Sequence, residues 1–402
     1  SSFTYLALFQ RTDSSTQLFS YFPHQIDCDR VLAGDEYYTK TIARRRVTLE
    51  AEILDMSCDA IQVCMTQLYI FRFSFQKRFH KFKIKDYQFI EQQIWNGYTL
   101  GNWYCFSIDL KSSEEFHRKI NQLANCLANV VVSNFSKQVG GGGMNQNYAH
   151  IDCMKTLASK QFEYIFLLQN HDIITRTHHE LSKILPALEG STVVEKGRCP
   201  PNRCTKNFPR NLGDLGMCPK SFGTEELAAC RAANITYMKG GMQALLPKAA
   251  SDFIVNEINT TFFVEMFNKK FAGDEQLFAT LTTTEALKIP GRYTANCGYP
   301  MMQLRVVWGD LKWCKSRYIR HSVCVFGIED LPALRRTHQF LINKMLPSFD
   351  NGVIQCYNEL LLKRNLGSEP SYDDIDNFLT SDYARFQRQL RLPGFNPADF
   401  IC

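Results

Sequence analysis

The chain has 402 residues, roughly two to three times the usual length of a domain, so one large domain with insertions and two domains both fit. Its 46 Lys and Arg against 40 Asp and Glu give a net charge of +6, too small over this length to indicate a nucleic-acid partner. A hydrophobic content of 45%, with 22 Gly and 14 Pro, excludes a disordered or collagen-like chain.

Fifteen cysteines are the unusual feature of the composition. Cytosolic proteins keep their thiols reduced, so this count indicates an oxidising compartment, with zinc binding as the alternative. The sequons at Asn134, Asn234 and Asn259 predict N-glycosylation in the same compartment. No stretch reaches the roughly 18 apolar residues of a membrane helix. Because the sequence begins at Ser1, an anchor ahead of it stays open.

The first part of the chain has weak periodicity. Residues 1–50 are mixed and polar, and we interpret them as a stem-like segment. From Tyr69 to Phe89 aromatic residues alternate with basic ones, which predicts exposed-edge strands or a hairpin. The same mixture also suits binding of single-stranded nucleic acid, but a period of two is the ordinary signature of a half-buried strand.

The next part alternates strands and helices. Strands are predicted at 103–109, 130–132 and 164–168, and helices at 113–129 and 148–160. This order predicts an α/β fold with a mostly parallel central sheet flanked by helices, whose binding groups lie at the carboxyl ends of the strands. Asp109 and Asp172 lie at two of these ends.

A loop-rich insert is predicted at 196–243. Its four cysteines have the spacing C-x4-C-x13-C-x11-C, which matches none of the tight pairs of structural zinc sites, so disulfides or shielded thiols are favoured. These cysteines are Cys199, Cys204, Cys218 and Cys230.

The last part returns to helices and strands. A helix is predicted at 249–268, strands at 304–308 and 322–327, and helices through 361. We therefore assign the main domain to residues 51–362 and a C-terminal extension to residues 363–402.

Two Asp-x-Asp triplets, Asp27/Asp29 and Asp374/Asp376, have the pattern with which many nucleotide-sugar transferases hold a divalent ion. Such a motif should follow a buried strand in the middle of the chain, and neither triplet does. The strand in that place ends in Asn170-His171-Asp172. A nucleotide-sugar enzyme of this sequence is therefore expected to work without a metal.

Positive side chains are the expected replacement for that ion. The segment from Lys312 to Lys344 contains seven basic and two acidic residues, which gives it a formal charge of +5. Fixed cations beside a leaving diphosphate stabilise its developing charge. The alternative is a solvated basic surface, which charge alone favours slightly.

Glu275 is the carboxylate of most interest. It follows Gly273-Asp274 at the predicted start of a helix, where the helix N-terminus favours the ionised form that a general base needs. Acidic residues in a first helical turn are also routine caps, so this position alone does not assign a role.

Six segments together resemble the core-2/I-branching β-1,6-N-acetylglucosaminyltransferase family, from about Cys28 to Glu359. They are Asn102-Trp-Tyr-Cys-Phe-Ser-Ile-Asp109, His150-Ile-Asp-Cys-Met-Lys155, Tyr164-Ile-Phe-Leu-Leu-Gln-Asn-His-Asp172, Gly273-Asp-Glu-Gln-Leu-Phe-Ala-Thr280, Ser322-Val-Cys-Val-Phe-Gly327 with Asp330-Leu331, and Asn343-Lys344 with Ile354-Gln-Cys356. The first and third segments are most similar to the nematode-type branch of the family.

The resemblance implies a variant GT-A fold, stabilised by disulfides, in a Golgi type II membrane protein with a lumenal catalytic domain. Its N-terminal anchor would lie outside the given sequence. Such enzymes are inverting and metal-independent, and need no cofactor. They transfer N-acetylglucosamine from UDP-GlcNAc to the 6-hydroxyl of a sugar on an O-glycan or glycoprotein acceptor.

The resemblance also implies roles for single residues. Glu275 matches the catalytic base and Lys344 a residue that neutralises the UDP diphosphate. Asp109 falls at the uridine-binding carboxylate, and Glu195, 23 residues after Asp172, at an acceptor-binding glutamate. Trp308 falls at an acceptor-stacking tryptophan, although a lone Trp is more often a core residue.

The sequence departs from the family at three places. A second diphosphate-binding arginine of the family directly precedes Ser-Val-Cys, where this chain has His321, and Arg320 lies one position earlier. Asp310 stands where an acceptor-site tyrosine is expected. The segment 71–85 does not match the donor-site strand of the family, which leaves the uridine contacts there undefined.

The resemblance pairs eight of the cysteines. The implied disulfides are Cys28–Cys356, Cys58–Cys126, Cys105–Cys153 and Cys314–Cys324. The other seven cysteines are left unassigned, and their odd number implies a free thiol or an intermolecular bridge.

Two further functions stay open. The same fold is able to transfer another sugar, glucose or xylose, from its UDP donor. His321 in place of an arginine also permits a catalytically silent secretory glycan-binding protein.

Overall fold

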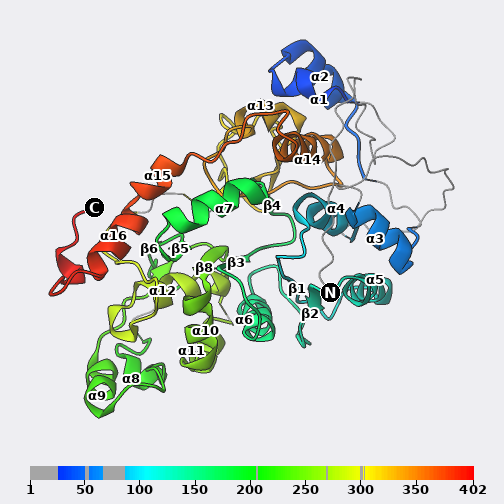
Figure 1. The fold of residues 1–402 in the computed structure, drawn as a ribbon. Coiled ribbons are helices and arrows are strands. Elements are labelled where there is room, and N and C mark those ends of the chain that lie inside the picture. The colour runs from blue at the N-terminus through cyan, green and yellow to red at the C-terminus, as the bar shows by residue number, and fades with distance from the viewer. Residues whose placement is uncertain are drawn as a thin grey trace, which may run out of the picture.

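The computed structural model describes residues 26–49, 54–66, 87–204, 207–268, 270–298, 302 and 304–402, and Figure 1 shows how they are arranged. Most of the stem-like segment and nearly all of the segment Tyr69–Phe89 lie outside these ranges. The last three residues of that segment begin a helix, where a strand was predicted. No helix in the described ranges is both long and apolar enough to cross a membrane.

The described chain is a mixture of helices and short strands. The α-helices are α1 (Cys28–Leu32), α2 (Glu36–Arg44), α3 (Cys58–Thr66), α4 (Tyr87–Gly97), α5 (Glu114–Cys126), α6 (Gln146–Leu157), α7 (His178–Ala187), α8 (Leu212–Leu215), α9 (Thr224–Ala232), α10 (Lys248–Asn256), α11 (Thr261–Asn268), α12 (Leu277–Thr283), α13 (Leu331–Leu334), α14 (Asn351–Asn365), α15 (Ile375–Leu379) and α16 (Asp382–Leu390). The 3₁₀ helices are η1 (Gly273–Glu275), η2 (Glu285–Leu287), η3 (Ile328–Asp330) and η4 (Pro397–Asp399). The strands are β1 (Tyr104–Phe106), β2 (Val130–Val132), β3 (Tyr164–Leu167), β4 (Ile173–Ile174), β5 (Val193–Val194), β6 (Gly197–Arg198), β7 (Met238–Lys239), β8 (Ala244–Pro247), β9 (Leu304–Arg305), β10 (Ile319–Arg320), β11 (Val323–Cys324) and β12 (Leu341–Ile342).

The predicted mostly parallel central sheet is wrong. β1 and β2 do pair in parallel, because α5 carries the chain back between them. β3, however, pairs antiparallel with β8, and β8 pairs antiparallel with β5. β8 follows the insert and runs back against β3, so no single crossover helix joins these neighbours. The third sheet is mixed, with β12 antiparallel to β4 and parallel to β9.

The helix predicted at 249–268 is two helices, α10 and α11, separated at residues 257–260. The side chain of Asn259 accepts a hydrogen bond from the N–H of Thr261 at 3.1 Å. Asn and Thr side chains compete in this way with the backbone bonds of a helix, which accounts for the break.

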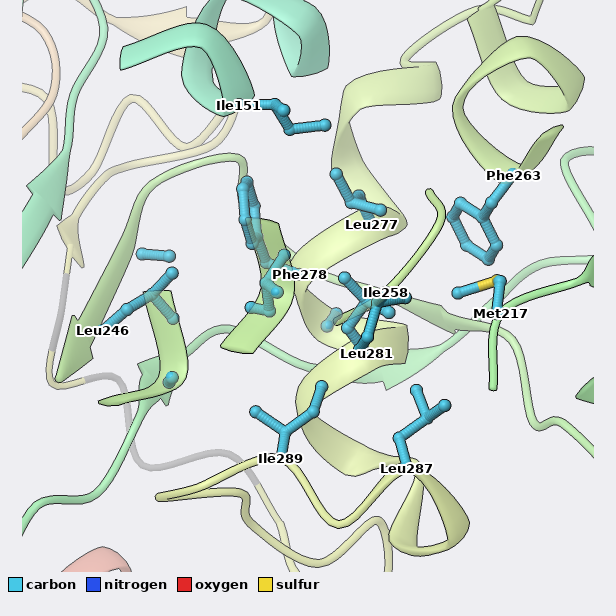
Figure 2. Close-up of a cluster of buried hydrophobic side chains, with 14 of the residues drawn as sticks. Ile151, Met217, Leu246, Ile258, Phe263, Leu277, Phe278, Leu281, Leu287 and Ile289 are labelled. Carbon is cyan, nitrogen blue, oxygen red and sulfur yellow. The ribbon is translucent and has the colours of Figure 1, made fainter. Parts of the chain in front are cut away.

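The largest apolar cluster surrounds α12, every residue of which is buried. Figure 2 shows Leu277 and Leu281 on this helix among side chains from other elements, including Ile151 of α6 and Phe263 of α11. Because α12 begins two residues after Glu275, this packing also fixes the position of that carboxylate.

The C-terminal segment shares a core with the main domain. α14 continues through the assigned boundary at 362, and Phe378, Tyr383 and Phe386 are buried in one cluster with Val193 and Leu245. Cys402 forms a disulfide with Cys297. Residues 363–402 are therefore packed against the domain, as the red helices in Figure 1 show.

The described residues contain seven disulfides, which join positions from 5 to 328 residues apart. All four implied pairs are present, namely Cys28–Cys356, Cys58–Cys126, Cys105–Cys153 and Cys314–Cys324. The insert forms Cys199–Cys204 and Cys218–Cys230, the disulfide alternative favoured there. Of the cysteines left unassigned, only Cys64 is without a described disulfide, and its side chain lies outside the described residues.

Candidate active site

Glu275 ends the 3₁₀ turn η1, directly before the buried helix α12. Its side chain is 19% exposed and forms ion pairs with Arg203 and with Lys239, the latter at 3.4 Å. Its backbone carbonyl accepts a hydrogen bond from the N–H of Gly240 at 2.6 Å. Both cations and this glycine come from the insert, so the insert contributes directly to the surroundings of Glu275.

Glu195 lies beside Glu275. It follows β5, and a Cβ added to Gly240 would lie 1.9 Å from its backbone oxygen, so only glycine fits there. Burial raises the pKa of Glu195, Lys239 lowers it, and the charge of Glu275 raises it. Lys239 therefore interacts with both glutamates, and the structure brings the proposed base and the proposed acceptor ligand into one cluster.

Asp274 adds a third acidic group next to the base. It is 7% exposed, and burial raises its pKa to about 6, with the charge of Glu275 acting in the same direction. A Cβ on Gly143 would meet the Asp274 carboxylate, so the glycine run at 140–143 covers this side of the cluster.

A second polar cluster lies where β3 and β12 end. Asp172 accepts hydrogen bonds from the backbone N–H of Gln169 at 2.6 Å, from Asn343 Nδ2 at 2.7 Å and from Gln243 Nε2 at 3.2 Å. Burial raises the pKa of Asp172 to about 6. The carboxylate predicted at a strand end is thus a buried anchor for the two loops that reach it.

Lys344 is half-buried directly after β12. Burial and the nearby charge of Arg320 lower its pKa, while Asp172 raises it. The charges of Arg320 and of the buried Asp172 thus act on Lys344 in opposite directions. Lysine and arginine side chains are the groups that pair with phosphate oxygens, so these two residues are the candidates for binding the donor diphosphate.

The β10–β11 hairpin decides where Arg320 and His321 lie. Arg320 pairs with Val323, and His321 and Ser322 form the turn with φ angles of 52° and 62°. Two-residue hairpin turns require such positive angles. Arg320 is thus the residue of this pair that interacts with Lys344, while His321 is an exposed turn residue.

Trp308 and Asp109 have different surroundings. Trp308 is 55% exposed and bridges to Val323 of the same hairpin, so it is no core residue. Asp109 accepts hydrogen bonds from the backbone N–H groups of Lys111 and Val139, both at 3.1 Å. These contacts of Asp109 involve neither cluster, and its role as a uridine ligand stays a prediction.

The Asp-x-Asp triplets have other partners. Asp27 accepts the N–H of Arg30 as the N-cap of α1, and Asp29 pairs with Lys363. Asp374 pairs with His338. In the described parts of the chain no group of three or more His, Cys, Asp and Glu side chains is arranged to hold a metal ion.

The predicted glycosylation sites share one property. Asn134, Asn234 and Asn259 are all exposed, as an acceptor asparagine must be.

Sequence reasoning missed Arg203 and Lys239, the two partners of Glu275. The insert was interpreted through its cysteines, and no motif marks either cation. The one available signal was the run Lys239-Gly240-Gly241, since paired glycines indicate a close approach of the backbone to another group.

A family model described as Core-2/I-Branching enzyme matches residues 81–335, more than half of the chain. The chain is a glycosyltransferase, and it belongs to the core-2/I-branching enzyme family.

Its curated relatives include vertebrate enzymes of low identity. Beta-1,3-galactosyl-O-glycosyl-glycoprotein beta-1,6-N-acetylglucosaminyltransferase 3 of Rattus norvegicus is 24% identical, over 84% of this chain and 82% of the relative. Beta-1,3-galactosyl-O-glycosyl-glycoprotein beta-1,6-N-acetylglucosaminyltransferase of Homo sapiens is 23% identical, over 85% of this chain and 86% of the relative. The enzyme of the same description from Bos taurus is 23% identical, over 91% of this chain and 92% of the relative.

Proposed function

We propose that this protein is an inverting β-1,6-N-acetylglucosaminyltransferase that uses UDP-GlcNAc and an O-glycan acceptor, without a divalent metal. The observation that carries the proposal is the cluster of Glu275 and Glu195 around Lys239 in a chain of this family. The names of the relatives support the donor sugar and the linkage.

In the proposed reaction, Glu275 removes the proton of the acceptor 6-hydroxyl. The hydroxyl oxygen attacks the anomeric carbon of GlcNAc on the face opposite UDP, and the bond from that carbon to the diphosphate breaks, so the configuration inverts. Arg203 and Lys239 hold the Glu275 carboxylate in one orientation before the acceptor arrives. Glu195 accepts hydrogen bonds from other acceptor hydroxyls.

The leaving UDP carries negative charge that must be stabilised. Lys344 and Arg320 supply positive charge at one place, which is the electrostatic work a metal ion does in other transferases. Three of the four aspartates in the Asp-x-Asp triplets, Asp27, Asp29 and Asp374, already have partners in the fold, which supports a reaction without the ion. In this proposal Asp109 binds the uridine, and the exposed ring of Trp308 stacks on the acceptor.

The proposed location is the Golgi lumen, with a type II anchor outside the given sequence. Seven disulfides support an oxidising compartment, and three exposed sequons support glycosylation there.

A donor and acceptor screen tests the proposal. The purified protein is incubated with UDP-GlcNAc, UDP-glucose or UDP-xylose, a β-1,3-galactosyl O-glycan acceptor and EDTA, and the product linkage is determined. We expect a β-1,6-linked GlcNAc product with no loss of rate in EDTA. Transfer of glucose or xylose alone, a strict manganese requirement, or glycan binding without any transfer would each contradict it.

A further inference from the structure

Six consecutive exposed residues, 308–313, separate the mixed sheet from the Cys314–Cys324 disulfide. Three of them are large and apolar: Trp308 and Leu311 are 55% exposed and Trp313 is 60% exposed. Large apolar side chains gathered on one exposed surface mark a binding site more often than isolated ones do. We call residues 308–321 the tryptophan ledge.

The tryptophan ledge is held firmly by its backbone. Gly309 N–H donates to the Ser322 carbonyl at 2.9 Å, and Trp313 N–H donates to the Asp310 carbonyl at 3.2 Å. The Asp310 carboxylate accepts the N–H of Lys312 at 2.8 Å. The disulfide joins Cys314 to Cys324 of β11, so Trp308 and Trp313 lie on a constrained loop. Little conformational entropy is therefore lost when these two side chains bind a ligand.

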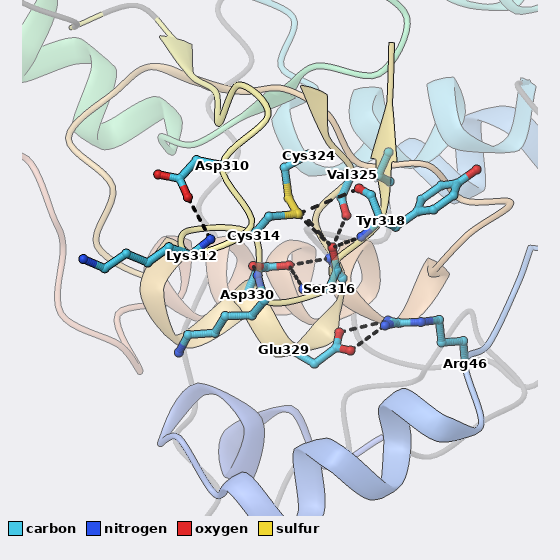
Figure 3. Close-up of a disulfide and its surroundings, with 12 residues drawn as sticks. Arg46, Asp310, Lys312, Cys314, Ser316, Tyr318, Cys324, Val325, Glu329 and Asp330 are labelled. Carbon is cyan, nitrogen blue, oxygen red and sulfur yellow. Dashed lines mark hydrogen bonds and ion pairs between the residues drawn. A yellow bond between two sulfur atoms is a disulfide. The ribbon is translucent and has the colours of Figure 1, made fainter. Parts of the chain in front are cut away.

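The charge of the tryptophan ledge is positive. It contains Lys312, Lys315, Arg317 and Arg320 against the single acid Asp310, a formal charge of +3. Figure 3 shows Asp310 facing the backbone nitrogen of Lys312, while the Lys312 side chain points away from the disulfide. The Lys312 ammonium lies 5.5 Å from the centre of the Trp313 ring.

Lys312 and Arg317 are two exposed cations of the ledge. Within the described residues, neither Lys312 nor Arg317 forms an ion pair, and both are exposed. Lys315 differs, because its positive charge interacts with Glu36 and helps to lower the pKa of that carboxyl group. Lys312 and Arg317 are therefore available to an anionic ligand.

The tryptophan ledge includes two residues that the proposed function uses, Trp308 and Arg320. Its last strand carries Arg320, whose charge acts on Lys344, and its first residue, Trp308, bridges to the same hairpin. If Trp308 stacks on the acceptor as proposed, the exposed residues that follow it in the ledge are available to further sugars of the same glycan.

We propose that Trp313, Lys312 and Arg317 form a second acceptor subsite, which binds an acidic sugar of the acceptor glycan beyond the one that is modified. The flat apolar face of the Trp313 indole packs on the C–H face of a sugar ring. Lys312 and Arg317 pair with its sulfate or carboxylate group. This subsite rests on the proposed function, since it extends that acceptor.

Direct binding tests the subsite without turnover. Three oligosaccharides with one β-1,3-galactosyl backbone, neutral, sulfated or bearing a carboxylated sugar, are titrated against the wild type and followed by tryptophan fluorescence and calorimetry. We expect the acidic glycans to bind about fivefold to twentyfold more tightly than the neutral one, as one or two exposed ion pairs allow. The two acidic forms separate sulfate from carboxylate recognition.

Variants locate the binding. Lys312→Ala with Arg317→Ala is expected to remove the preference for the acidic glycans, and Trp313→Ala to weaken binding of all three. Arg231→Ala and Leu100→Ala, at exposed positions far along the chain, are the matched controls and should change nothing. Unchanged melting temperatures show that the variants fold.

Equal affinity for the three glycans, or a preference that survives the double substitution, would overturn the subsite. Binding of the wild type to anionic phospholipid vesicles, lost in Trp313→Ala, with no glycan binding, would assign the ledge to a membrane surface and overturn it as well. A preserved preference in a protein that transfers no sugar would refute the proposed function and leave the ledge as a glycan site.

Discussion

Arg320 and His321 are neighbours in sequence and both are exposed, but Arg320 ends a strand and His321 begins the turn. His321 lies in the hairpin turn, while the charge of Arg320 lowers the pKa of Lys344. The turn therefore accommodates the one-residue shift from the family pattern, and Arg320 is the candidate partner of Lys344 in the proposed diphosphate site.

The first prediction compares these two neighbours. Arg320→Ala should weaken UDP binding about tenfold, because a charge-assisted contact to a phosphate is lost. His321→Ala should leave UDP binding unchanged. Calorimetric titration with UDP measures both; an equal loss in the two variants would place the histidine in the anion site.

Asp172 predicts a pH dependence of stability. Burial raises its pKa from 3.8 to about 6 in the folded protein. Between these values the folded state holds a proton that the unfolded state has lost, so the free energy of unfolding falls as the pH rises through this window. The contribution is about 1 to 3 kcal/mol, and Asp274 acts in the same direction.

Urea denaturation of the wild type and Asp172→Asn between pH 4 and 7 measures this effect. The variant cannot titrate at residue 172, so its stability should decline less as the pH rises. An identical slope in the two proteins would mean that Asp172 is ionised throughout.

The sequence predicted the acidic residues of the site better than the basic ones. Glu275 and Glu195 lie in segments or at spacings that resemble the family, and they meet in the fold. Arg203 and Lys239 reach Glu275 only because the insert folds back over η1. Contacts of this kind depend on tertiary structure and leave no periodic pattern.

At the scale of elements, the insert supplies Arg203 and Lys239, the two cations paired with Glu275. The disulfide Cys199–Cys204 closes a loop with a separation of five residues, and Arg203 lies within it. This short loop sets the position of the guanidinium that meets Glu275.

The third prediction separates positioning from stability. Replacing Cys199 and Cys204 by Ser should lower kcat/KM for the acceptor about tenfold, because Arg203 loses its fixed position. Loop closure of this size is worth about 2 kcal/mol. The matched control replaces Cys218 and Cys230, which close another loop of the insert; it should cost similar stability without a change in acceptor kinetics.

Steady-state kinetics and thermal melting of both double variants check this prediction. Equal kinetic losses in the two variants would show that the disulfides act only through stability.

Most elements were predictable, but their pairing was not. The sequence periodicity located β3 correctly, and the alternation of strands and helices suggested parallel neighbours. β3 instead pairs with β8, which follows the long insert. Strand partners across an insert depend on its path, which local patterns do not contain.

At the scale of the molecule, Cys28–Cys356 joins the N-terminal helices to α14 over a separation of 328 residues. α1 contacts α13, and α2 contacts η3. Figure 3 shows Arg46, just after α2, paired with Glu329 of η3. The N-terminal helices are thus part of the catalytic fold.

The fourth prediction concerns this long disulfide. In the chain-entropy model it stabilises the fold by about 5 kcal/mol, more than the short disulfide of the insert. Cys356→Ser should therefore lower the melting temperature more than the Cys199/Cys204 double variant does. Differential scanning calorimetry measures both, and the reverse order would show that native packing, not loop length, sets their effects.

The central claim is that Glu275 is the base of a sugar transfer from UDP-GlcNAc. Glu275→Gln keeps the shape of the side chain and removes its capacity to accept the proton, so transfer should fall by about 10² to 10⁴. UDP binding, measured by calorimetry on the same preparation, should be unchanged because Lys344 and Arg320 remain. A variant that binds UDP and still transfers GlcNAc at the wild-type rate would contradict the claim.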